Sequence, residues 1–200
     1  MRPMDLDQLL DPAIRRYDYE DLMQHAAGML KPSGPDFVFI HLCAPHEPGF
    51  YNRKTHQFDG SRNRSYIDNV ALTDKALGQF MAILRQSPRW KNTNLIISSD
   101  HSWRTFLWKG GTYWTPEDQA ASHGGVFDSR PLLMIHLAGQ TTPATVSEPF
   151  PLLRVHDILD DLVTGKRPTF PVEQAKDIGQ KDPSSRLKAT NPCPVNHTCE

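Results

Sequence analysis

The sequence predicts an α/β domain with a mostly parallel sheet, because apolar segments of strand length alternate with helical segments along the chain. The first apolar segment, Asp36–Cys43 (DFVFIHLC), is nearly continuous and rich in Phe, Val and Ile, which is typical of a central strand buried on both faces. Asn94–Ser99 and Pro131–Leu137 are two further expected strands. This order implies a parallel sheet with helices on its faces.

Three segments are expected to be helices. Tyr19–Leu30 ends at the breaker Lys31–Pro35, and Val155–Val163 is amphipathic. The strongest helical pattern covers Ser65–Gln86, where apolar residues recur every three or four positions. Asp74 falls on that stripe, and a carboxylate on a buried face needs a partner, so we expect Asp74 to be structural rather than catalytic. The stripe consists of Ile67, Val70, Ala71, Leu77, Met81 and Leu84.

The remaining segments indicate how the chain is organised. Ala44–Arg64 has the composition of a loop, and Ser102–Gly125 is a Trp- and Gly-rich excursion too long for a simple connection, which favours a functional role. From Gly165 onward the sequence is polar and without periodicity, so we expect an extended tail. We therefore divide the chain into an α/β domain over residues 1–164 and a tail over residues 165–200.

Composition excludes several classes of protein. The chain has 200 residues, of which 38% are hydrophobic, and 22 Lys and Arg residues balance 23 Asp and Glu residues, which argues against a nucleic-acid-binding protein. No stretch approaches the length of a membrane span, and Met1–Leu10 lacks the pattern of a signal peptide. Cys43 is expected to be buried, whereas Cys193 and Cys199 could pair in an oxidising compartment.

Three histidine-bearing positions lie where expected strands begin or end. Asp100-His101 directly follows the expected strand Asn94–Ser99, and a carboxylate next to an imidazole suits Zn²⁺ or Mn²⁺. His46 lies between two prolines at the exit of the first strand, so it is well placed to meet a substrate. His41 alternates within the apolar run, and the pattern alone favours a core histidine there.

His123 is followed by Gly124 and Gly125, which allow the backbone to approach a metal or an anion closely. Each of these positions also has a plain structural interpretation, a turn cap or a surface loop, but three of them at strand ends are harder to explain that way. The remaining histidines are interpreted as structural or exposed: His25, His56, His136, His156 and His197.

Taken together, these motifs resemble the C-terminal half of a sulfatase-like domain of the alkaline phosphatase superfamily. The nearest subgroup is that of the phosphoethanolamine transferases and related membrane-anchored sulfatase-like hydrolases. The resemblance implies an alkaline-phosphatase-like three-layer sandwich, in which a mostly parallel sheet has helices on both faces. The resemblance covers about residues 36–137. The motifs that carry it are His41 with Ala44-Pro45-His46-Glu47-Pro48, Tyr66-Ile67-Asp68-Asn69, Thr73-Asp74-Lys75-Ala76-Leu77-Gly78 and Ser98-Ser99-Asp100-His101.

The resemblance implies metal-dependent hydrolysis or transfer of a sulfate or phosphate ester by in-line displacement. Asp100 and His101 match the family's metal-binding pair, with Zn²⁺ as the expected ion and Ca²⁺ or Mn²⁺ as alternatives. His46 and His123 match histidines that contact the transferring group or a second metal, and His41 is a further substrate-binding candidate. Arg104 is equally consistent with a bidentate contact to an anionic substrate and with a surface role.

Two departures from the family pattern qualify this expectation. Ser102-Trp103-Arg104 follows Asp100-His101, where the family usually has Gly. Nothing before Asp36 resembles the family's half that carries the nucleophile and the first acidic ligands. We therefore expect a domain incomplete at its N-terminus, little activity by itself, and a need for that half or for a partner subunit.

Three alternatives stay open from the sequence. The chain could be a catalytically inactive remnant that serves as a binding module, with Trp103, Trp108 and Trp114 as its contact surface. It could be a single α/β domain whose histidines coincide by chance. Phosphoglycerate mutase-like and phosphodiesterase branches of the superfamily also remain open. The compartment is not predicted, although the family is often periplasmic or membrane-anchored.

Overall fold

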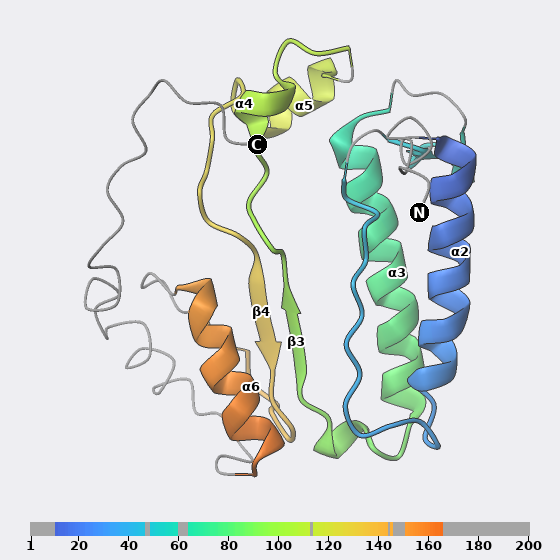
Figure 1. Ribbon diagram of the computed structural model, residues 1–200, viewed down its shortest axis with the longest axis vertical. Coiled ribbons are helices and arrows are strands. Elements are labelled where there is room, and N and C mark those ends of the chain that lie inside the picture. Colours follow the sequence, from blue (N-terminus) through green and yellow to red (C-terminus); the bar gives the residue numbers. More distant parts are fainter. Residues whose placement is uncertain are drawn as a thin grey trace, which may run out of the picture. The chain divides into compact units, whose positions relative to one another are not determined.

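A computed structural model describes residues 11–46, 49–59, 64–112, 114–143, 145 and 151–165 (Figure 1). The chain divides into two parts, which are described separately. The first contains residues 1–93 and 97–132, and the second contains residues 94–96 and 133–200. The expected tail over residues 165–200, with Cys193, Cys199 and His197, lies outside the described residues apart from Gly165. No helix among the residues described is both long enough and apolar enough to cross a membrane.

The first part begins with helix α2 (Pro12–Met29), which starts seven residues before the expected Tyr19. Asp11 explains the earlier start, because its carboxylate accepts a hydrogen bond from the Ala13 amide at 2.7 Å. Pro12 at the first helical position is compatible with that cap, since proline has no amide hydrogen to leave unsatisfied. The predicted helix is confirmed, and it is longer than its apolar pattern indicated.

Helix α3 (Tyr66–Gln86) matches the expected segment and is capped by Ser65, whose Oγ accepts a hydrogen bond from the Ile67 amide. It lies against α2, the hairpin strand β1 and helix α5. The predicted apolar stripe is only partly buried: Val70 is 39% exposed and Asp74 is exposed, whereas the other members of the stripe are half-buried. The stripe that is buried also has helical spacing, and it consists of Asp68, Asn69, Leu72, Ala76 and Phe80.

The expected loop over residues 44–64 contains an antiparallel hairpin. Its strands are β1 (Tyr51–Asn52) and β2 (Gln57–Phe58), with Tyr51 opposite Phe58. Aromatic rings from the hairpin complete the core of the first part: Phe50 stacks on Phe58 at 5.9 Å between centroids, and Tyr19 of α2 contacts both rings. The buried members of this core are Tyr19, Ala44, Phe50, Tyr51, Leu72 and Ala76.

The segment 36–43 is not a strand, which corrects the expectation of a central strand buried on both faces. It is irregular, and Phe37 and Phe39 are 58% and 78% exposed. Cys43, which was expected to be buried, is exposed as well. A strand is stable only when a neighbour pairs with its backbone, and no sheet among the residues described includes this segment. Arg89 holds its beginning by donating to the Gly34 carbonyl at 2.9 Å and pairing with Asp36.

The second part is built on strands β3 (Leu95–Ser98) and β4 (Leu133–His136), which pair with each other in opposite directions (Figure 1). Both lie inside the expected strands. Helix α6 (Val155–Val163) has the expected bounds and follows the short 3₁₀ turn η2 (Leu152–Arg154). Its Ile158 is buried with Leu137 in a small core, on which Ile96, Ile135 and Leu162 pack.

The expected fold class is therefore borne out only in part. The described residues form helices and two small sheets of two strands each, rather than a mostly parallel sheet in three layers. Two short helices, α4 (Thr105–Trp108) and α5 (Pro116–Ala121), occupy the Trp-rich excursion, and the 3₁₀ turn η1 (Trp90–Asn92) follows α3. Local pattern located the helices, whereas a sheet depends on pairing between distant segments, which local pattern does not specify.

Burial of Tyr19 makes the stability of the first part sensitive to alkaline pH. Burial chiefly, and then the nearby Tyr51 and Glu20, raise the pKa of the Tyr19 phenol to about 12. The folded state therefore holds this proton more tightly than the unfolded state. The contribution to stability is complete below about pH 10 and is lost as the pH rises toward 12, by about 2–3 kcal/mol at most.

The measurement is the free energy of unfolding in urea at about pH 9 and about pH 11 for Tyr19→Phe beside the unchanged chain. The unchanged chain should lose more stability between the two pH values than the variant does. Tyr17→Phe on the same helix, where Tyr17 is 68% exposed, is the matched control and should behave like the unchanged chain. Equal losses in all three proteins would contradict the prediction.

Candidate functional site

The first turn of α3 is a buried polar junction on which the candidate site rests. The Ser65 hydroxyl donates to Asp118 Oδ1 at 2.7 Å, and both side chains are buried. Asp118 belongs to α5, where its Oδ2 accepts hydrogen bonds from the amide and the hydroxyl of Thr115, at 3.0 and 2.7 Å. One carboxylate therefore caps its own helix and fixes that helix to the start of α3.

Asn69, one turn into α3, holds the loop that carries His46. Its buried amide nitrogen donates to the His46 carbonyl at 3.0 Å, and its Oδ1 accepts from the Phe50 amide at 3.3 Å. Arg15 of α2 donates to the same His46 carbonyl at 2.5 Å. The backbone of His46 is thus fixed from two helices while its imidazole remains exposed, which is a suitable arrangement for a side chain that meets a ligand.

Helix α4 connects the neighbourhoods of His46 and His123. The His46 ring lies edge-on to the Trp108 ring, with 6.2 Å between centroids. The next residue, Lys109, donates from Nζ to the Gly124 carbonyl at 2.6 Å. His123 is exposed and has a φ of 51°, a left-handed conformation that few residues other than glycine adopt, and its presence is a reason to consider function there.

The glycines after His123 allow a close approach, but of a lysine side chain rather than of the expected metal or anion. Gly125 has a φ of +82°, and a Cβ added there would lie 2.5 Å from Lys109 Cδ. The Lys109 side chain therefore packs directly on the glycine backbone, and this close approach would be lost with a larger residue. The Ser122 hydroxyl closes the same turn by donating to the Asp118 carbonyl at 2.6 Å.

Asp100 and His101 are the pair that the sequence predicts to bind a metal ion. His101 Nδ1 lies 2.7 Å from the Ser102 carbonyl oxygen, which can only accept, so Nδ1 carries a proton, and in the neutral imidazole the lone pair is on Nε2. A backbone carbonyl that orients the imidazole in this way is typical of metal-binding histidines. Nε2 faces Asp100 Oδ2 at 3.7 Å.

That spacing suits a shared divalent ion. Zinc binds imidazole nitrogen and carboxylate oxygen at about 2.0–2.2 Å, which at a tetrahedral angle separates the two ligand atoms by about 3.4 Å. A small side-chain rotation would bring Asp100 and His101 to that distance. The two donors therefore fit zinc or manganese in chemistry and spacing, but two ligands are only half of a complete set.

The other predicted residues do not join this pair as ligands. In the described part of the chain, no three His, Cys, Asp or Glu side chains converge to hold a metal ion. His41 is exposed, which corrects its interpretation as a core histidine, and its ring nitrogens lie 3.9 Å from Cys43 Sγ. Arg104 is exposed directly before α4, and its position there does not indicate a contact with a substrate.

Charged residues near α5 are balanced against one another. Arg53 donates to Asp68 at 3.3 Å and to Glu117 at 2.8 Å, and Lys54 lies 3.1 Å from Glu117. The hydrogen bond from Lys54, followed by the charge of Arg53, lowers the pKa of the Glu117 carboxyl. A cavity of about 370 Å³ lies against these pairs, and its positive and negative groups offset each other. It therefore shows no preference for a charged ligand.

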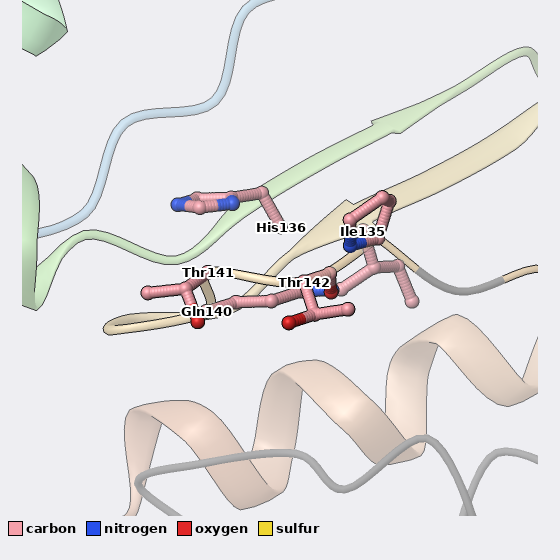
Figure 2. Close-up of a pocket in the computed structure, with 6 residues that line it drawn as sticks. Ile135, His136, Gln140, Thr141 and Thr142 are labelled. Carbon is pink, nitrogen blue, oxygen red and sulfur yellow. The ribbon is translucent and has the colours of Figure 1, made fainter.

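A second cavity of about 320 Å³ lies in the second part of the chain, at the loop that follows β4 (Figure 2). Its lining includes His136, Gln140 and Thr142 but none of the residues that the sequence singles out for chemistry. The Gln140 amide is used within the loop, because Oε1 accepts from the Leu137 amide at 3.1 Å and Nε2 donates to the Thr142 carbonyl at 2.9 Å. We assign no function to this cavity.

Sequence analysis missed the residues that hold the site together. Asn69, Arg15 and the Ser65–Asp118 pair were not singled out, although Asn69 belongs to a quoted motif. A signal was present: Asn69, Leu72, Ala76 and Phe80 recur at helical spacing, so the polar residue belongs to a buried stripe. A polar residue on such a stripe needs a buried partner, and here it finds two backbone groups.

Comparisons with known proteins agree with the motif order. A family model described as sulfatase matches residues 4–129. Phosphoglycerol transferase I of Citrobacter koseri and that of Escherichia fergusonii are each 31% identical over 101 residues, and that of Salmonella typhi is 29% identical. Each match covers 48% of this chain but only 12% of the relative. No solved structure matches the chain.

Replacing Asn69 by alanine should release the His46 loop. The substitution leaves the buried Phe50 amide without its acceptor and removes one of the donors to the His46 carbonyl. It should lower the free energy of unfolding by about 1–3 kcal/mol. Hydrogen exchange should also rise at residues 44–50. Gln79→Ala, an exposed change on the same helix, should shift stability by about 0.5 kcal/mol or less. Equal effects of the two substitutions would contradict the role given to Asn69.

Proposed function

This chain belongs to the sulfatase family, and from its site geometry we propose that it contributes part of a metal-dependent active site that acts on phosphate esters. The family implies chemistry on sulfate or phosphate esters, and the relatives named phosphoglycerol transferase I favour phosphate over sulfate. They also favour transfer to an acceptor over hydrolysis. The phosphoethanolamine group expected from the motifs is not the group in those names, so a phosphodiester carrying glycerol is the better candidate substrate.

The observation that carries the proposal is the orientation of His101. The Ser102 carbonyl fixes the proton on Nδ1, so that Nε2 faces Asp100 Oδ2 at 3.7 Å with its lone pair free. Asp100 and His101 would hold a divalent ion, with Zn²⁺ preferred and Mn²⁺ or Ca²⁺ as alternatives. The ion, when bound, would stabilise negative charge that develops on the oxygens of the transferring group.

The remaining candidate residues would act on the substrate. His46 has a fixed backbone and an exposed imidazole, so it could donate a hydrogen bond to a phosphoryl oxygen or move a proton to a leaving oxygen. His123 could provide a second contact from the glycine turn, while His41 and Arg104 are secondary candidates for binding the anion. A nucleophile and further metal ligands are also required, and in the family they belong to the half of the domain that this chain does not resemble.

The alternative proposal is an inactive remnant that binds a partner without catalysis. The convergence of only two potential ligands in the described part of the chain is the observation that favours it. Metal binding separates the two proposals, because a remnant under no demand to bind metal need not preserve the Asp100–His101 spacing.

The test is the affinity of the full chain for Zn²⁺ and Mn²⁺, measured by competition with a chromogenic chelator. The double variant Asp100→Ala with His101→Ala should weaken binding at least about tenfold, because both ligands are removed. The double variant His156→Ala with Asp157→Ala is the matched control, since it removes an exposed His–Asp pair 3.8 Å apart on α6 and should leave the affinity unchanged. Equal affinities in all three proteins would overturn the metal-site proposal and favour the inactive remnant.

A further inference from the structure

Trp103 lies two residues after His101, and its indole contacts two other aromatic rings. It stacks on Tyr66 with 4.4 Å between centroids and 14° between planes. It also contacts Trp114 in a tilted arrangement, with 5.5 Å between centroids and 32° between planes. Aromatic pairs of this kind are stabilised beyond the area that they bury. The indole is therefore held by two neighbouring rings.

The two outer rings are themselves fixed to helices. Tyr66 is the first residue of α3, directly after the Ser65 cap. Trp114 donates from Nε1 to Gln119 Oε1 on α5 at 2.8 Å. Because the Ser65–Asp118 hydrogen bond joins these two helices, the stack is mounted on the buried polar junction. Trp103 thus connects the Asp100–His101 loop to the buried polar junction of the first part of the chain.

The loop has a second anchor on its other side. The Ser99 amide donates to the Leu132 carbonyl at 3.1 Å, and the Ser99 hydroxyl accepts from the Leu132 amide at 2.9 Å. Asp100 and His101 lie between Ser99 and Trp103. The hydrogen bonds of Asp100 and His101 run to adjacent residues, so these bonds shape the loop without fixing it to the rest of the chain. The contacts of Ser99 and Trp103 fix the loop at its two ends.

The stack, not a hydrogen bond, positions Trp103. Its indole N–H is buried and has no acceptor among the residues described. A buried donor without a partner weakens the folded state, so the contribution of Trp103 comes from the stacking surface of its ring and not from the indole N–H. A phenylalanine would keep a stacking surface and remove the unsatisfied donor, which makes it a conservative replacement at this position.

We propose that Trp103 is a positioning residue for the metal-binding pair: its stacked indole holds the loop in the conformation in which His101 Nδ1 donates to the Ser102 carbonyl and Nε2 faces Asp100. The identity of the ion that the pair binds rests on the proposed function, whereas the effect of Trp103 on the orientation of His101 does not. Trp103 comes directly after Ser102, the residue that stands where the family usually has Gly.

The experiment compares Trp103→Ala and Trp103→Phe with the unchanged full chain by two readouts. The first is the tautomer of His101, read from nitrogen chemical shifts of the imidazole, which requires no metal. The second is the affinity for Zn²⁺ measured by chelator competition. Trp90→Phe in η1 is the control for loss of a tryptophan elsewhere, and circular dichroism of the helices confirms that each variant is folded.

In Trp103→Ala, His101 should change from one tautomer, with the proton on Nδ1, to a mixture of both, and zinc should bind about tenfold more weakly or worse. Trp103→Phe and Trp90→Phe should retain the single tautomer and an affinity close to that of the unchanged chain. A folded Trp103→Ala that keeps the single tautomer would overturn the inference, and so would a mixed tautomer in the unchanged chain. If the unchanged chain binds no zinc, the proposed function fails, and the tautomer readout still decides the role of Trp103.

Discussion

The hydrogen bond between Ser65 and Asp118 is the interaction on which the rest of the first part depends. It joins the beginning of α3 to α5, two segments separated by about fifty residues in sequence. Both side chains are buried, so the bond is not in competition with water, and removing either partner would leave the other unsatisfied.

The junction explains why polar residues occupy the buried stripe of α3. Asp68 accepts from the Arg53 amide and guanidinium, which ties the hairpin to the helix. Asn69 accepts from the Phe50 amide and donates to the His46 carbonyl. An apolar residue at either position would pack as well but would leave loop backbone groups without partners. At its first turn the helix therefore buries polar side chains that bind the surrounding loops, in place of side chains that would make only apolar contacts.

The sequence predicted those features that local pattern determines. Helix α6 has the expected bounds because its apolar periodicity is strong. Helix α3 begins one residue after the expected start, because Ser65 is its cap rather than its first helical residue. The face of α3 was not predictable, since two stripes on this helix have helical spacing and only tertiary contacts choose between them. The segment 36–43 has the composition of a buried strand, yet a strand also needs a partner, and pairing is a property of distant residues.

The candidate site divides in the same way. The positions of Asp100 and His101 after a strand could be read from the sequence, because β3 is a local feature and the family motif is short. The roles of Asn69 and Trp103 could not, because each acts on a loop far away in sequence or through rings that the fold brings together. Motifs therefore identify the atoms that could perform chemistry, whereas the groups that orient them emerge only with the tertiary structure.

The role proposed for Trp103 agrees with the exposure of Asp100 and His101. The Asp100 side chain is 79% exposed and the His101 side chain 41%. Hydrogen bonds in such a place compete with water and contribute little to holding a loop still. Stacked rings exclude water from their faces and lose little rotamer freedom, so they remain effective two residues from an exposed site. A pair of side chains that stays open to solvent is therefore better fixed by a stacked indole beside it than by further polar contacts of its own.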